Sequence, residues 1–122
     1  MTNGFFIENT PLIRIILGWG QSVQAPFVIL DTGFTGDLQV TSKIAIELGL
    51  ELIGVTNVQI ANGQIVRVPM AIAFASMEGI KNYVQVLISD SVPLAGISFL
   101  SKFGYKATID CKYKTVKLEK SI

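Results

Sequence analysis

The stretch Phe27-Val28-Ile29-Leu30-Asp31-Thr32-Gly33-Phe34-Thr35-Gly36 organises the interpretation of this chain. Its first four residues are apolar and Pro26 precedes them, which is typical of a short buried strand. Gly33 and Gly36 then favour a turn directly after the strand. Asp31 therefore falls at the end of a core strand, where a carboxylate without a partner is costly to bury. A sequence that places a carboxylate there is predicted to use it.

The triplet Asp31-Thr32-Gly33 also has a purely structural interpretation. An aspartate often accepts a hydrogen bond from its own backbone in a turn, and glycine readily follows it. Three residues alone do not distinguish such a turn from a functional carboxylate, so the rest of the chain has to decide.

Length and composition predict one folded domain over residues 1–122, with residues 1–10 as a lead-in that is flexible or lies at an interface. Half of the residues, 50%, are hydrophobic. The longest apolar candidate, Pro11–Gly20, contains Arg14 and is about half as long as a membrane span needs to be. No signal peptide is visible. The surplus of apolar residues therefore predicts a subunit interface.

Charge and rare residues exclude several function classes. The net charge of +1 predicts neither a nucleic-acid partner nor a membrane partner. Cys111 is the only cysteine, so there is no disulfide framework and a cytoplasmic location is expected. The chain contains no histidine, which removes the Ser-His and Cys-His hydrolase mechanisms. We expect neither a metal ion nor a cofactor.

Short strands and two short helices are expected along the rest of the chain. Pro11–Gly18 and Pro26–Leu30 form a hairpin whose second arm delivers Asp31. Thr41 or Ser42 caps a helix that ends at Gly49. The dipeptide Asn62-Gly63 favours a type I′ turn between expected strands at 56–61 and 64–68, because both of its positions need positive φ. The remaining expected elements are strands at 38–40, 70–75, 83–88, 107–110 and 115–118 and a helix at 98–103. The predicted fold class is all-β, as a closed or sandwiched β domain.

Three motifs in order give the chain a resemblance to a known family. Asp31-Thr32-Gly33 follows an apolar strand, the Asn62-Gly63 hairpin lies roughly midway, and Leu94-Ala95-Gly96-Ile97-Ser98-Phe99-Leu100 follows later. This arrangement resembles the retropepsin-like aspartic proteases, whose Asp-Thr-Gly loop is followed by a flap hairpin and then by an apolar-apolar-Gly segment. The resemblance covers Pro11 to about Leu118 and is closest to the small prokaryotic members of the family.

The resemblance implies a retropepsin-like closed β-barrel that forms a homodimer. Two Asp31 carboxylates would share one water and hydrolyse a peptide or protein substrate, one carboxylate being ionised and one protonated. Thr32 would hydrogen-bond across the dimer, and Gly33 would let the backbone pass close to the carboxylates. The implied site residues are catalytic Asp31, Thr32 and Gly33; substrate-binding Phe34, Thr35, Ala61, Asn62, Gly63 and Gln64; and structural Leu94, Ala95 and Gly96. Gly96 would allow its segment to pass close beneath the Asp31 loop.

Two positions depart from the family pattern. Phe34 stands where Ala or Ser often follows the triplet, and a serine there would bond the outer carboxylate oxygen. Retroviral members carry an ion pair at the positions of Thr35 and Ile97, so both of its partners are missing together. The first hypothesis is an aspartic endopeptidase. The alternatives are a catalytically silent retropepsin-like module for dimerisation or peptide binding, and a β domain in which Asp31 only caps a turn.

Overall fold

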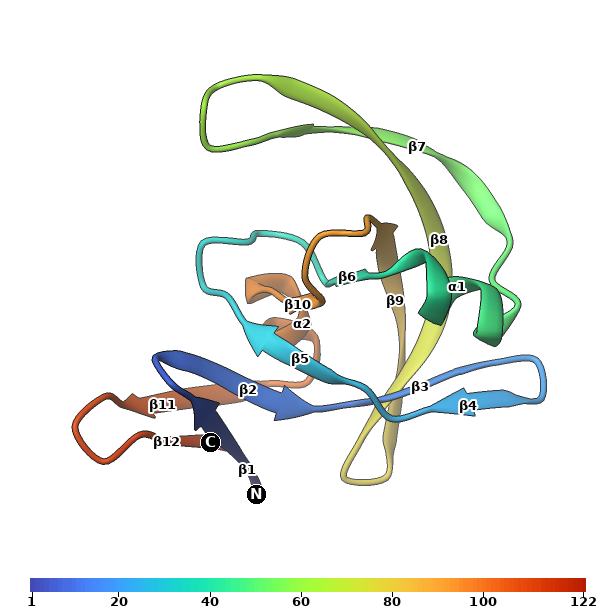
Figure 1. Ribbon diagram of the computed structural model, residues 1–122. Helices are drawn as coiled ribbons and strands as arrows, with labels where there is room; N and C mark the ends of the chain where they lie inside the picture. Colours follow the sequence, from blue (N-terminus) through green and yellow to red (C-terminus); the bar gives the residue numbers. More distant parts are fainter.

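A computed structural model describes residues 1–122 as a mostly β structure with two short helices (Figure 1). The predicted all-β class is therefore confirmed. The elements are β1 (Thr2–Ile7), β2 (Thr10–Arg14), β3 (Ile16–Trp19), β4 (Ser22–Gln24), β5 (Phe27–Leu30), β6 (Leu38–Val40), α1 (Ser42–Leu48), β7 (Leu52–Gln59), β8 (Ile65–Met77), β9 (Ile80–Ile88), β10 (Leu94–Ala95), α2 (Ile97–Lys102), β11 (Tyr105–Asp110) and β12 (Thr115–Lys120).

All of the strands belong to one sheet, and this sheet is open. Its order is β11-β12-β1-β2-β5-β10-β6-β9-β8-β3-β4, with β7 added to β8. Because β11 and β4 do not pair with each other, the expectation of a closed barrel was wrong. The strong curvature instead folds one sheet around a single core. That core comprises Ile13, Ile15, Leu17, Val28, Leu30, Leu38, Val40, Ala45, Leu48, Ala73, Ala75, Met77, Val84, Val86, Ala95, Phe99, Leu100, Phe103, Tyr105, Val116 and Leu118.

The first ten residues are paired within the sheet, so they are not the flexible lead-in that was one of the two predictions; their placement at an interface stays a prediction. β1 pairs antiparallel with β12, where Thr2 lies opposite Leu118, and with β2, where Phe5 lies opposite Leu12. A side chain at Gly4 would collide with the carbonyl oxygen of Leu12, since a Cβ atom would lie 2.2 Å from it. The two ends of the chain therefore lie beside each other in neighbouring strands (Figure 1).

The predicted helix after β6 is confirmed, with its caps. The Thr41 side chain accepts a hydrogen bond from the Ile44 amide, and Gly49 ends the helix at φ 70° in the left-handed region. α1 packs against β4, and Gln24 of that strand donates a hydrogen bond to Glu47 at 2.6 Å. The helix therefore covers the end of the sheet formed by β4, which is opposite the end formed by β11 and β12.

The strand β8 is longer than predicted and forms an arm over the body. It joins the two expected strands at 64–68 and 70–75 into one, because Pro69 lies opposite Val55 without ending the pairing. Its second half, from Met70, pairs with β9, whereas its first half pairs with β7 alone. The β7–β8 hairpin therefore projects beyond the sheet and arches over the loop between β5 and β6 (Figure 1).

Candidate active site

Asp31 is delivered by β5, which lies between two neighbouring strands. β5 pairs antiparallel with β2 and parallel with β10, where Leu94 lies opposite Ile29. The Asp31 amide continues this ladder by donating to the carbonyl oxygen of Ala95 at 3.0 Å. Side chains alternate along the strand, with Val28 and Leu30 buried, so Asp31 points to the same face as Phe27 and Ile29. The carboxylate is thus partly exposed on a mainly apolar face.

The carboxylate of Asp31 contacts its own turn. Asp31 Oδ1 accepts a hydrogen bond from the Gly33 amide at 2.9 Å, and the main-chain carbonyl oxygen of Asp31 accepts one from the Phe34 amide at 3.1 Å. A Cβ atom at position 33 would lie 3.2 Å from Asp31 Oδ1, so the predicted close passage of Gly33 is present. The Thr32 side chain is exposed and makes no hydrogen bond within the chain. These contacts orient one carboxylate oxygen and leave the other without a protein donor.

The later apolar segment supports the loop from beneath, as the sequence predicted for Gly96. A Cβ atom at Gly96 would lie 2.3 Å from the carbonyl oxygen of Gly36 and 2.4 Å from that of Phe34. The Gly96 amide donates to the Asp37 carbonyl oxygen at 3.0 Å, and the Ile97 amide donates to that of Phe34 at 2.9 Å. Only glycine permits this close approach of two backbones.

The Phe34 ring packs inward against glycine. Cβ atoms at Gly36 and Gly96 would lie 2.7 Å and 2.8 Å from atoms of the Phe34 ring. The bulky residue that departs from the family pattern is therefore accommodated because both of its neighbours lack side chains. Phe34 and Thr35, which the sequence predicted to bind substrate, also line a cavity of about 360 Å³ beside the loop.

The roof of this cavity comes from β7, the first strand of the β7–β8 hairpin, and this hairpin is called the flap below. The four residues Thr56–Gln59 of β7 line it, opposite Gly33–Gly36 of the loop, and Gln85 and Leu87 of β9 form a wall. Sequence reasoning missed these roof and wall residues. In the structure Thr56 and Val58 are half-buried whereas Asn57 and Gln59 are exposed. The signal available in the sequence was only the expected strand at 56–61, in which alternate side chains share a face.

The tip of the flap lies outside this cavity. Ala61, Asn62, Gly63 and Gln64 were predicted to bind substrate, and all four are exposed without lining any cavity. Only Gly63 has positive φ, at 83°, so the predicted type I′ turn was wrong. The Gly63 amide donates to the Ile60 carbonyl oxygen, which makes a three-residue turn with a left-handed glycine. The type I′ signature occurs instead at Glu78-Gly79, where both φ values are positive.

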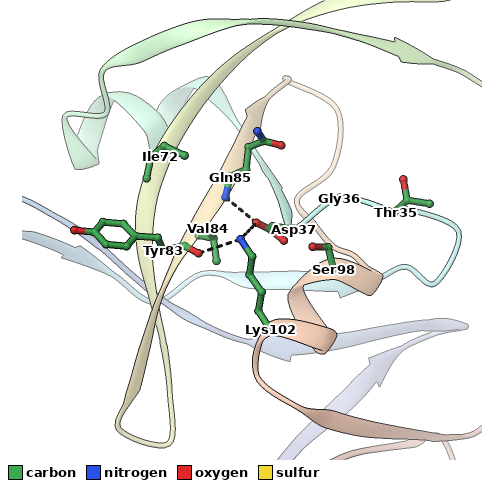
Figure 2. Close-up of a pocket in the computed structure, with 9 residues that line it drawn as sticks. All are labelled: Thr35, Gly36, Asp37, Ile72, Tyr83, Val84, Gln85, Ser98 and Lys102. Atoms are coloured by element: carbon green, nitrogen blue, oxygen red, sulfur yellow. Dashed lines mark hydrogen bonds and ion pairs between the residues drawn. The ribbon is translucent and has the colours of Figure 1, made fainter.

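A second cavity, of about 380 Å³, lies on the other side of the same loop (Figure 2). Asp37 stands at its floor and is only 5% exposed. Asp37 Oδ2 accepts one hydrogen bond from the Lys102 ammonium at 2.6 Å and another from the main-chain amide of Gln85 at 2.8 Å. The Lys102 Nζ also donates to the Tyr83 carbonyl oxygen at 3.1 Å, and Ser98 lies beside the carboxylate. Sequence reasoning missed this ion pair, because its partners are 65 residues apart in the chain.

The surroundings of Asp37 change its ionisation. Burial raises the pKa of its carboxyl, while hydrogen bonds from Lys102, Ser98 and the Gln85 amide, together with the charge of Lys102, lower it. The net result holds the pKa of Asp37 below its ordinary value. Asp37 is therefore a charged structural partner at neutral pH.

The structure contains no group of three or more His, Cys, Asp or Glu side chains that could hold a metal ion. Neither of the two helices is long and apolar enough to cross a membrane.

Comparison with known proteins gives structural neighbours. No protein-family model matches the chain, and no curated protein matches it in sequence. The structure is similar to EIAV protease complexed with the inhibitor HBY-793, with a TM-score of 0.66 and 19% sequence identity over 86% of this chain and 98% of that one. It is also similar to a retropepsin-like aspartic protease from Rickettsia conorii, with a TM-score of 0.65 and 16% identity over 97% of this chain and 88% of that one.

Both neighbours are matched over most of their length; the first is a protease, and the second is a retropepsin-like aspartic protease, the family that the three sequence motifs suggested. The chain therefore has the fold of the retropepsin-like aspartic proteases.

Proposed function

We propose that the chain is an aspartic endopeptidase that acts as a homodimer. The observation that carries this proposal is the placement of Asp31, which is partly exposed at the carboxyl end of β5 and fixed by the Ala95 carbonyl and the Gly33 amide. The chain supplies one such carboxylate, whereas peptide hydrolysis by this chemistry needs two around one water. A second copy related by a twofold axis would supply the other.

The roles of the two carboxylates follow from their proximity. Two carboxyl groups that share a water cannot both ionise easily, so one stays protonated. The ionised group accepts a proton from the water, and the protonated group donates to the peptide carbonyl oxygen as the water attacks the carbonyl carbon. Collapse of the resulting tetrahedral species expels the amine, which takes the proton that the first carboxylate accepted from water, while the second carboxylate recovers its proton from the tetrahedral hydroxyl. The exposed Thr32 hydroxyl has no partner in its own chain and is free to bond across the dimer.

Features around Asp31 suit a peptide substrate. Phe27 and Ile29 share the face of Asp31, and Leu94 lies opposite Ile29 in the neighbouring strand. This apolar surface favours substrates with apolar side chains next to the cleaved bond. The hairpin of β7 and β8 forms a roof over the adjoining cavity, where it would limit access of bulk water to the reacting groups.

One observation favours a second candidate function. Asp31 Oδ1 accepts the Gly33 amide at 2.9 Å, which is the contact expected of an aspartate that merely stabilises a turn. A catalytically silent retropepsin-like module for dimerisation or peptide binding needs nothing more of Asp31. The two candidates differ in whether the carboxylate has to exchange protons.

Asp31→Asn tests the proposal. We expect peptide cleavage to fall by about 10⁴-fold or more, because the amide keeps the shape of the side chain but cannot accept the proton of the water. Stability should rise in the same variant, more at neutral pH than in acid, because two facing carboxylates no longer repel each other. Cleavage of a peptide library and chemical denaturation over a pH series measure the two effects.

Asp110→Asn is the matched control. Asp110 Oδ1 caps its own turn through the amides of Lys112 and Tyr113, at 3.0 Å and 2.9 Å, far from the Asp31 loop in the sequence. This variant should keep full activity. If wild-type protein cleaves no peptide between acid and neutral pH, and Asp31→Asn changes stability no more than Asp110→Asn does, the module without catalysis replaces the protease.

A further inference from the structure

We propose that the Asp37–Lys102 ion pair is a positioning device that holds the Asp31 loop in the geometry needed for cleavage. This inference rests on the proposed function. It assigns a role to two residues that never touch the substrate, and it concerns how the loop is held, independently of which peptide is cut.

The first support is that Asp37 closes the loop that Asp31 opens. The amide of Asp31 donates to Ala95 at 3.0 Å, and the carbonyl oxygen of Asp37 accepts from Gly96 at 3.0 Å. Between them, the carbonyl oxygen of Phe34 accepts from Ile97 at 2.9 Å. All three main-chain bonds attach the loop to one short segment, so the position of the loop depends on how that segment is fixed.

The second support is that the ion pair fixes this segment to a different strand. Lys102 lies in α2, which begins directly after Gly96, and its ammonium group donates both to Asp37 Oδ2 and to the Tyr83 carbonyl oxygen of β9. Asp37 Oδ2 also accepts the Gln85 amide of β9. The carboxylate and the ammonium group therefore connect the end of the loop, the helix and the strand at one point (Figure 2).

The third support is the energetic character of the pair. Asp37 is the one charged residue among the buried residues of the chain. Taking a carboxylate out of water is costly, so the attraction of Lys102, whose side chain is 40% exposed, mainly offsets the burial of Asp37 and adds little net stability. The pair does impose a specific geometry, because Asp37 Oδ2 accepts hydrogen bonds from two different elements, the Lys102 ammonium of α2 and the main-chain amide of Gln85 in β9. A role in positioning therefore explains this pair better than a contribution to overall stability.

The fourth support is that the pair adjoins the substrate cleft. The cavity around Asp37 and Lys102 and the cavity under the flap share Thr35, Gly36 and Gln85 as lining residues. The main-chain amide of Gln85 donates a hydrogen bond to Asp37, and the same residue lines the cavity under the flap. A shift of the pair would thus move both the loop and the wall of the cleft.

Lys102→Met tests the role of the pair. The variant keeps the aliphatic length of the side chain but leaves the Asp37 carboxylate buried without its cation. We expect kcat to fall about 10-fold to 100-fold while KM changes less than about 3-fold, since small displacements of reacting groups cost rate more than binding. Lys102→Arg should restore most of kcat, because it returns a cation that can reach the carboxylate.

Lys120→Met is the matched control. The Lys120 ammonium donates to the Phe103 carbonyl oxygen at the end of α2 and lies 4.8 Å from the centre of the Tyr105 ring, but it has no contact with the loop. Its loss removes a lysine hydrogen bond from the same helix, and kcat should stay within about 2-fold of the wild-type value. Equal losses of kcat in Lys102→Met and Lys120→Met would overturn the inference.

The pH dependence of stability distinguishes loss of the Asp37–Lys102 ion pair from other structural effects of the Lys102→Met substitution. Lys102 is the charged group that faces Asp37; Tyr83 of β9 contributes its carbonyl oxygen, and Ser98 of α2 lies alongside. Because the pKa of Asp37 is lowered in the fold, the pair stabilises wild-type protein above the ordinary carboxyl pKa of 3.8 and loses this effect as pH falls through the lowered value. Lys102→Met removes the hydrogen bond and the charge of Lys102, two of the causes that lower the pKa of Asp37, while burial still acts to raise it, so acidification should relieve the destabilisation. The difference in unfolding midpoint between the two proteins should be largest at neutral pH and shrink in acid.

Hydrogen exchange gives a readout that does not need activity. In Lys102→Met the amides of Asp31, Gly96 and Ile97 should exchange faster relative to amides of the β1–β12 pair, under conditions where circular dichroism shows the variant folded. If Lys102→Met does not fold, the double variant Asp37→Asn with Lys102→Met, which buries no charge, is compared instead. Unchanged exchange of these three amides together with unchanged kcat would overturn the inference. If wild-type protein cleaves no peptide, the proposed function fails, and the exchange of these amides alone decides whether the pair holds the loop.

Discussion

The loop Asp31–Asp37 and the flap tip Ile60–Gln64 lie on the same side of the molecule but are held in opposite ways (Figure 1). The loop is bound by main-chain hydrogen bonds to β10 and α2 and by a buried carboxylate to β9. The tip is exposed, and its hydrogen bonds are with its own hairpin. This contrast is what the proposed function requires, namely a firmly held loop beneath a hairpin that we expect to open.

Gly96→Ala is the change expected to disturb this contrast most. Its Cβ atom would lie 2.3 Å and 2.4 Å from two main-chain oxygens of the loop. The Phe34 oxygen cannot move away without losing its hydrogen bond from the Ile97 amide, so the free energy of unfolding should fall by about 3 kcal/mol or more. Urea denaturation measures the loss.

Gly18→Ala is its control, because the nearest atom to the new Cβ there is the Ser22 carbonyl oxygen at 3.6 Å, an ordinary contact. That variant should change the free energy of unfolding by less than about 1 kcal/mol. Similar losses in both variants would mean that the passage beneath the loop is not tight.

Amide hydrogen exchange in the wild type should display the contrast directly. The amides of Asp31 and Ile97 bond between separate elements, whereas those of Ile60 and Gly63 bond within one hairpin. We expect the first two to be protected about 10²-fold more strongly than the second two, because the flap can open without unfolding the body. Equal protection would show that the flap is part of the rigid body.

Gly63→Ala should have the smallest effect on stability. Gly63 has φ of 83° in the flap and Gly104 has φ of 64° in the body, so alanine is strained at both positions. Gly104→Ala should lower the free energy of unfolding by about 1 kcal/mol, whereas Gly63→Ala should lower it by less than about 0.5 kcal/mol, because the strained flap can open locally. Thermal unfolding of both variants compares them, and a larger loss at Gly63 would contradict the assignment of a loosely held tip.

Features that depend on neighbouring residues in the sequence were predicted better than pairings between distant parts of the chain. The strand before Asp31, the cap at Thr41 and the close passage at Gly96 depend on residue types within a few positions, and all three are confirmed. The pairing of β1 with β12 was missed, because it joins residues more than 100 positions apart, such as Thr2 and Leu118. Nothing in a local pattern records such a partner.

The candidate site shows the same division. Phe34 and Thr35, which follow the Asp-Thr-Gly motif directly, line the cavity beside the loop, and their contact with substrate stays a prediction. The flap was predicted from its turn residues, yet the residues that line the cleft lie on the strand, at Thr56–Gln59. The register of β7 against β8 decides which residues face inward, and the turn dipeptide alone did not specify that register.

Mixing subunits tests the central claim, that two Asp31 carboxylates from two copies form one site. Wild-type chains are refolded together with Asp31→Asn chains in varied proportions, and peptide cleavage is measured per wild-type chain. If both carboxylates are needed, activity per wild-type chain falls in proportion to the wild-type fraction, to half in an equal mixture, because random pairing leaves fewer wild-type homodimers. If activity per wild-type chain stays constant at every proportion, each chain acts alone and the shared site does not exist.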